Sequence, residues 1–177
     1  DKFCPEANRA VVLSRLAKAL IISLLAQAGP VAAENYFDWA KVGAEARERG
    51  LPVALLITGT DCGYCERLRQ EFLEAPATRG TLEQGAVTQE ISRDEGGKVT
   101  DFDGERIRTR LFLARYGIFA TPTLLFLSPE GEMLAPALVG FNGARNYGDL
   151  VAKRMNRAHA NLASGERPSR SMLADSE

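Results

Sequence analysis

Two cysteines three residues apart, Cys62 and Cys65, are the side chains of this 177-residue sequence best suited to chemistry. Gly63 and Tyr64 separate them, so a disulfide between the two thiols would close a small ring that can open again. The thiolate is the reactive form of cysteine, and the start of a helix lowers a thiol pKa from about 8.5 into the range of roughly 3.5–7.5. The spacing therefore indicates reversible dithiol–disulfide chemistry if a helix begins at Cys62.

Two other interpretations of the pair stay open at this point. A structural zinc site needs about four ligands, usually with a second pair of Cys or His. The sequence adds only Cys4 and His159, both far away and outside any paired spacing. An inert structural disulfide would join very little chain at this separation. We expect no metal and no cofactor besides a redox-active disulfide between Cys62 and Cys65.

The segments around the pair predict a strand and a helix. Residues 51–57 form a short apolar run bounded by turn residues, which is typical of a buried strand. Residues 62–74 have helical spacing, and Pro76 follows soon after. This order places Cys62 at the start of the helix.

A second motif, Thr121-Pro122, stands immediately before an apolar run at residues 123–127. Proline cannot donate to a sheet ladder, so Pro122 must begin the strand or lie at its edge. An X-Pro bond can also be cis at modest cost. Local sequence alone favours the start of a strand, and the cysteine pair adds weight to a functional role.

With both motifs in place, residues 35–157 resemble the thioredoxin-like superfamily. The resemblance implies an α/β fold, with a central mixed β-sheet flanked by helices. It also implies a cis Pro122 that faces the cysteine pair. The backbone of Thr121 and Pro122 would bind a substrate polypeptide as an added strand, while Gly63 and Tyr64 would shape its approach.

Residues 99–104, followed by a helix that ends at Tyr116 and Gly117, are similar to periplasmic SoxW-type thioredoxins. Those proteins serve sulfur oxidation or general periplasmic thiol reduction. The Cys-Gly-Tyr-Cys motif with threonine before the proline is also similar to the disulfide isomerase DsbC, although no separate dimerisation domain is expected here. We therefore expect an enzyme, a thiol-disulfide oxidoreductase that reduces protein disulfides. A disulfide isomerase or oxidase and a non-catalytic peptide-binding module remain the alternatives.

Two positions depart from thioredoxins proper. Leu56 stands where they carry a buried acid, six residues before the first cysteine, and Asp61 replaces the usual tryptophan. A carboxylate beside Cys62 disfavours its thiolate unless that carboxylate caps the helix. Asp61, Glu66 and water remain the candidate proton carriers.

The rest of the chain predicts further elements. Two aspartates, Asp101 and Asp103, lack the other ligands of a calcium loop, so we interpret them as a surface turn. Before the loop at 92–104, the expected elements are a helix at 35–48 ended by Gly50 and a second strand at 85–91 beside the first. After it, we expect a helix at 106–116 with Ile107 and Leu111 on its apolar side. A turn at 129–132, a partner strand within 133–139 and a last helix at 147–161 follow.

The first 33 residues have the pattern of a secretory signal peptide. A positive stretch at 14–18 precedes an apolar core at 19–26, and a small-residue signature ends at Ala33. The core is short for a membrane span of about 20 residues. An uncleaved membrane anchor and an amphipathic helix packed on the domain are the alternatives. We expect a signal peptide or anchor at 1–33, a thioredoxin-like domain at 34–162, a flexible tail at 163–177, and a periplasmic location.

Composition bears on the expected partners. The net charge of −1 gives no reason to expect binding to nucleic acid. We expect disulfide-containing protein substrates, with a membrane thiol reductant as the electron donor.

Overall fold

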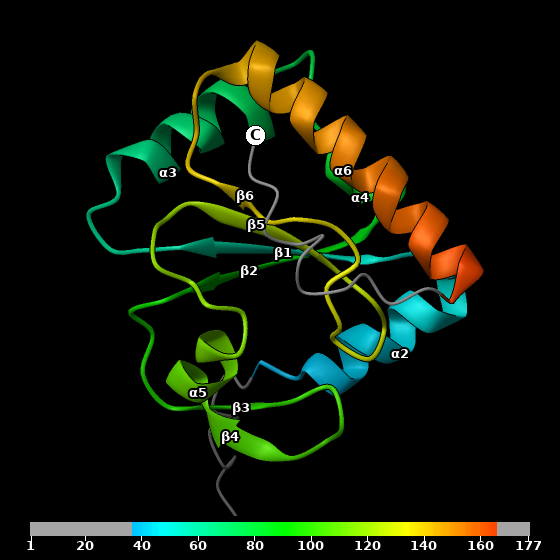
Figure 1. Ribbon diagram of the computed structural model, residues 1–177. Helices are drawn as coiled ribbons and strands as arrows, with labels where there is room; N and C mark the ends of the chain where they lie inside the picture. Colours follow the sequence, from blue (N-terminus) through cyan, green and yellow to red (C-terminus); the bar gives the residue numbers. More distant parts are fainter. Residues whose placement is uncertain (1–36, 166–177) are drawn as a thin grey trace, which may run out of the picture. The chain divides into compact units, whose positions relative to one another are not determined.

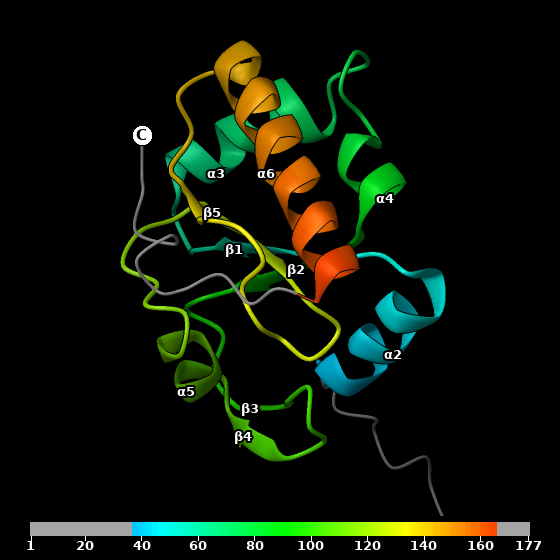
Figure 2. The same ribbon diagram turned by 45° about the vertical axis from the view of Figure 1, so that its right-hand side comes forward.

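The computed structural model of the protein describes residues 37–165. Figure 1 shows their arrangement, and Figure 2 shows it turned by 45°. The elements run in the order α2 (Trp39–Arg49), β1 (Val53–Thr58), α3 (Gly63–Leu68), the π-helix η2 (Arg69–Leu73), α4 (Thr81–Gly85), β2 (Val87–Ser92), β3 (Lys98–Thr100), β4 (Arg106–Arg108), α5 (Thr109–Ala114), β5 (Thr123–Leu127), β6 (Leu138–Val139) and α6 (Ala144–Ser164).

The central sheet is mixed and four-stranded, in the order β2-β1-β5-β6. β1 lies parallel to β2 and antiparallel to β5, and β6 adds to β5 in the antiparallel direction. The strand predicted at 123–127 is confirmed at both ends, and the predicted second strand lies beside the first. These strands confirm the expected α/β fold with a mixed sheet flanked by helices.

Alternate residues of β1 pack in two separate hydrophobic cores, one on each face of the sheet. Successive side chains of a strand point to opposite faces, so a continuously apolar strand needs cover on both. Ala54 and Leu56 pack in one core with residues of α3, α4 and α6, whereas Leu55 and Ile57 pack in the other with residues of α2 and α5. Figures 1 and 2 show these two sets of helices on opposite sides of the sheet.

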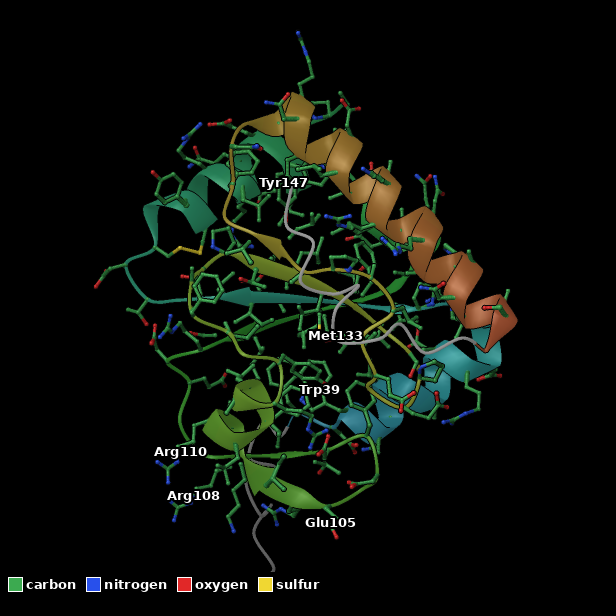
Figure 3. The ribbon with its side chains drawn as sticks, in the orientation of Figure 1. Trp39, Glu105, Arg108, Arg110, Met133 and Tyr147 are labelled. Atoms are coloured by element: carbon green, nitrogen blue, oxygen red, sulfur yellow. A yellow bond between two sulfur atoms is a disulfide. The ribbon has the colours of Figure 1, made fainter. Side chains whose placement is uncertain are left out.

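The core beneath α2 and α5 is built around aromatic rings. Trp39 is fully buried, and its ring centroid lies 5.0 Å from that of Phe112 and 5.5 Å from that of Phe37. Phe102 completes this aromatic cluster at 5.9 Å from Trp39. Figure 3 shows the Trp39 side chain between α2, to which it belongs, and α5. Trp39 therefore packs the first described helix of the domain against α5.

Asp101 lies at the turn between β3 and β4, as predicted, but the expectation that it is a surface residue is wrong. Its side chain is only 2% exposed and forms an ion pair with Arg115. The hydrogen bond with Asp101 raises the pKa of Arg115. The buried carboxylate therefore ties the β3–β4 turn to the end of α5, while Asp103 stays exposed.

The helix predicted at 106–116 begins three residues later than expected. Residues 106–108 form β4, which pairs antiparallel with β3 inside the predicted loop. The burial pattern explains the difference, because Ile107 is half-buried between two exposed arginines, as in a strand. Leu111 is 55% exposed, and Phe112 supplies the buried side of α5 instead.

The last helix, α6, extends beyond the predicted span at both ends and stops where Gly165 adopts a left-handed conformation with φ 65°. Gly50 ends α2 in the same way, as predicted. Within residues 37–165, no helix is long and apolar enough to cross a membrane. The signal peptide or anchor predicted at 1–33 lies outside the described residues, as do residues 166–177 of the predicted tail.

Candidate active site at the cysteine pair

The turn after β1 places Cys62 at the tip of α3. Cys62 is the N-cap residue of this helix, and its carbonyl accepts the backbone N–H groups of Cys65 and Glu66 at 3.0 and 3.1 Å. Its Sγ accepts the N–H of Cys65 at 3.2 Å. The first thiol therefore lies at a helix start, as predicted, where backbone N–H groups favour a negative charge.

Cys62 and Cys65 are joined by a disulfide with a Cα–Cα distance of 5.2 Å. Cys65 is 8% exposed, whereas Cys62 is half-buried, so Cys62 is the sulfur that a visiting molecule reaches more easily. Among residues 37–165, no group of three or more His, Cys, Asp or Glu side chains is arranged to hold a metal ion.

The second motif lies against the first, although 59 residues separate them. The Thr121–Pro122 peptide bond is cis, as the family resemblance implied. The hydroxyl of Thr121 donates to Cys62 Sγ at 3.4 Å. The structure thus brings the Thr121–Pro122 turn to the sulfur of Cys62.

The backbone of Thr121 has free hydrogen-bonding capacity. Neither its N–H nor its carbonyl has a partner within residues 37–165, whereas the carbonyl of the buried Pro122 accepts from Gly140 at 2.7 Å. Thr121 and Pro122 directly precede β5, so these free groups lie at the start of a strand that is already paired with β1 and β6. They are available to the backbone of an extended peptide.

Each of the two motifs has an exposed aromatic side chain in or near it. Tyr64, within the cysteine motif, is 59% exposed, and Phe119, two residues before Thr121, is 77% exposed. Gly63 is exposed beside Tyr64 and adds no side chain of its own. Exposed aromatic rings of this size are typical of surfaces that bind polypeptides.

A cavity of about 520 Å³ opens beside the disulfide. Asp61 and Glu66, two proton carriers proposed from the sequence, both line it. Asp61 is exposed and has a φ of 53°. Glu66 is also exposed and accepts a hydrogen bond from Gln70. The other lining residues are Thr58, Gly59, Cys62, Gly63, Cys65 and Arg69.

Sequence reasoning missed a third carboxylate at this site, that of Glu90. Glu90 lies on β2 in direct register with Leu56, the position where thioredoxins proper carry their acid. Its Oε1 accepts from the Thr58 hydroxyl at 3.1 Å and from the Arg69 guanidinium at 2.8 Å. Both donors line the cavity that Cys65 also lines. A charged residue beside a wholly apolar strand is the signal that could have identified it.

Three loops meet near Gly59. The carboxylate of Asp94 accepts the backbone N–H of Thr60 at 2.7 Å. A Cβ atom at Gly59 would lie 3.1 Å from Thr121 Oγ1 and 3.2 Å from Asp94 Oδ2. Glycine at this position therefore allows the loop after β1 to approach the other two closely.

The fold and the site together define a class of proteins. The family profile of the thioredoxin-like domain matches residues 40–153, so the chain belongs to the thioredoxin-like domain family. A comparison with curated proteins finds no significant match.

Two solved structures illustrate the similarity of the fold. A protein described as DsbH oxidoreductase is 20% identical, with 73% of this chain and 91% of that chain covered and a TM-score of 0.53. The C-terminal domain of DsbD from Neisseria meningitidis, in its oxidised form, is 17% identical, with 65% and 90% covered and a TM-score of 0.50.

Proposed function

We propose that the protein is a thiol-disulfide oxidoreductase that reduces disulfides of polypeptide substrates. The observation that carries this proposal is the position of Cys62, at a helix tip beside the Thr121–Pro122 backbone and bonded to a more buried Cys65. In this arrangement Cys62 can attack a substrate disulfide, and Cys65 can then release the substrate from Cys62.

The first step uses the reduced protein, in which both cysteines are thiols. The Cys62 thiolate attacks one sulfur of a substrate disulfide, whose S–S bond breaks while a Cys62–substrate disulfide forms. The leaving substrate thiolate takes a proton. The N–H of Cys65 and the hydroxyl of Thr121 both point at Cys62 Sγ and stabilise its thiolate before attack.

The second step resolves this mixed disulfide. The Cys65 thiol loses its proton, and the resulting thiolate attacks Cys62 Sγ and releases the second substrate thiol. Two electrons have then passed from the protein to the substrate, and the Cys62–Cys65 disulfide is restored. A dithiol donor, such as a membrane thiol reductant, returns the protein to its reduced form.

Cys65 needs a proton acceptor for this step, and Glu90 is the group that we assign to it. Glu90 reaches the shared cavity through the Thr58 hydroxyl, so it acts as a positioning and relay residue through Thr58 and water. Asp61 and Glu66 line the same cavity from its exposed side, and Arg69 faces Glu90 from η2. The bonds to Thr58 and Arg69 hold Glu90 in one place, which favours it over the two exposed carboxylates.

The proposal includes export to the periplasm. Its support is the signal-peptide pattern of residues 1–33 together with the similarity of residues 99–104 to SoxW-type thioredoxins. Cell fractionation of the full-length protein, with detection of cleavage after Ala33, tests this part separately.

An insulin-reduction assay tests the activity. The wild-type protein should accelerate reduction by dithiothreitol, and Cys62→Ser should return the rate to that of the protein-free control. The Cys65→Ser variant should accumulate mixed disulfides with its substrates, because the releasing thiol is missing. Peptide binding without any reduction by the wild-type protein would favour a non-catalytic binding module.

A redox titration of the Cys62–Cys65 pair decides the direction. A reductase requires a potential near that of thioredoxin, about −270 mV, whereas a value near −120 mV is that of a strong oxidant. A potential at the oxidising end would replace the reductase with an oxidase of the same fold.

A further inference from the structure

A second cavity, of about 350 Å³, opens between the β3–β4 ribbon and the start of α5. Its charged lining consists of three cations, Lys98, Arg108 and Arg110, and one carboxylate, Glu95. In Figure 3 the side chains of Arg108, on β4, and Arg110, on α5, extend outward near one another, while Glu105 lies farther away at the other end of β4. We call the cavity with these three cations the basic pocket.

The cations of the basic pocket are not neutralised within the domain. No ion pair joins Lys98, Arg108 or Arg110 to a carboxylate in the part of the chain that the structure describes. Two other exposed arginines are paired, Arg47 with Glu130 and Arg67 with Glu71. The basic pocket therefore concentrates uncompensated positive charge on a protein of net charge −1.

The pairing register of the ribbon intensifies this charge. Lys98 stands directly opposite Arg108 across the two strands. Like charges in that position destabilise a strand pair. An anionic ligand would relieve the repulsion, since guanidinium groups pair with carboxylates through two parallel hydrogen bonds.

A short segment of chain connects the basic pocket to the loops around the disulfide. The segment that follows β2 first contacts the active-site loops, because Arg93 donates to the Phe119 carbonyl at 3.5 Å and Asp94 accepts from Thr60. Lys98 follows Asp94 by four residues, so the two Cα atoms are at most about 14 Å apart. Asp94 itself lies near Thr121, because a Cβ atom at Gly59 would be 3.2 Å from Asp94 Oδ2 and 3.1 Å from Thr121 Oγ1. A polypeptide bound at Thr121 can therefore extend along this segment toward the basic pocket.

We infer that the basic pocket binds an acidic segment of the polypeptide whose disulfide is reduced at Cys62. This inference rests on the proposed function and specifies its substrate class, which is disulfides flanked by glutamate or aspartate. The attraction raises the rate of encounter with such substrates, because a concentrated charge of one sign draws in a partner of the opposite sign. Substrates without acidic residues still react, at a lower rate.

Two synthetic peptides test the inference. Both contain the same intramolecular disulfide, and one carries a short run of glutamates where the other carries glutamines. The reduced wild-type protein should react with the acidic peptide about 10-fold faster at low salt. Arg108→Gln combined with Arg110→Gln should lower this ratio to about 2, because most of the positive charge is gone.

A matched control uses two exposed cations of α6, Lys153→Gln combined with Arg157→Gln. It removes the same charge far from the ribbon in sequence and should keep the ratio of the wild type. The glutamine peptide should react at the wild-type rate with all three proteins, and this rate reports the proposed function independently of the pocket. If neither the wild type nor either variant reduced the glutamine peptide, the proposed function itself would be rejected.

Several outcomes would overturn the inference. They are equal rates for the two peptides with the wild type, an unchanged ratio in the arginine variant, and an equal loss in the α6 control. The inference would also fail if the ratio of the two peptide rates depended on protein concentration, because a second copy of the chain would then occupy the pocket. Should the arginine variant fail to fold, Lys98→Gln and a salt titration of the wild type replace it. The ratio must then fall as NaCl rises from about 0.01 to 0.5 M, as expected for screened charges.

Discussion

The loops around the disulfide and the aromatic cluster are built in opposite ways. The loops, residues 59–62, 93–95 and 119–122, are largely exposed and are held together by polar contacts such as that between Asp94 and Thr60. The aromatic cluster surrounds a Trp39 with no exposed surface. Stability and reactivity are thus assigned to different parts of one small domain, and substitutions should separate them.

The largest effect is expected at the aromatic cluster. Trp39→Ala should lower the free energy of unfolding by about 3–5 kcal/mol, because it removes buried apolar surface and leaves a cavity. Chemical denaturation measures this change. Insulin reduction per folded molecule should stay near that of the wild type, since Trp39 lies away from the disulfide.

Trp39→Phe is the matched control for this substitution. The Trp39 indole N–H has no hydrogen-bond partner among residues 37–165, so the smaller ring also removes a buried unsatisfied donor. It should cost clearly less than Trp39→Ala. Equal costs for the two variants would contradict the importance assigned to ring stacking.

An intermediate effect is expected at Glu90. Glu90→Gln should slow the attack of Cys65 on a Cys62 mixed disulfide by about 10-fold near pH 7, because glutamine cannot accept the proton. The deficit should shrink as the pH rises toward about 8.5, where an ordinary thiol ionises without help. Stopped-flow kinetics of a preformed mixed disulfide at several pH values measures this step.

The control for this prediction is Glu66→Gln, which neutralises a carboxylate that itself lines the cavity. It should leave the pH profile of the resolving step unchanged. Glu90→Gln also leaves Arg69 without its carboxylate partner, and a merely structural disturbance would lower the rate equally at every pH. A pH-independent deficit would therefore rule out the relay.

The smallest effect is expected at the Thr121 hydroxyl. Thr121→Val keeps the shape of the side chain and removes the donor 3.4 Å from Cys62 Sγ. The pKa of the Cys62 thiol should rise, because its thiolate loses one hydrogen bond, and the rate of attack near neutral pH should fall about 3-fold. Thiolate absorbance near 240 nm as a function of pH measures the shift. Thr123→Val is the control, because that hydroxyl donates to Ala120 instead.

The sequence was sufficient to predict the parts of this site that lie in short, typical patterns. The position of Cys62 at a helix start followed from a buried strand and a resumed helical spacing, and β5 followed from a proline before an apolar run. The pairing of the two motifs came from family resemblance, because no local pattern relates residues 59 positions apart.

The parts that could not be predicted depend on contacts between distant strands. The charge of Glu90 in a predicted strand was visible in the sequence, but its place opposite Leu56 became clear only when β2 was placed in register with β1. The ribbon was misassigned because Ile107 and Leu111 have helical spacing, although Ile107 belongs to a strand. Asp101 was misplaced because its partner, Arg115, lies fourteen residues away on another element.

The fully buried β1 has one more consequence, for how exactly the reactive sulfur can be placed. A slip of a single residue along this strand would exchange Leu55 for Leu56 and send every side chain to the wrong core. It would also carry the attached helix tip about 3.3 Å along the strand axis. The apolar packing of the two cores thus fixes the position of Cys62 along the strand axis. This positioning does not depend on any group that takes part in the reaction.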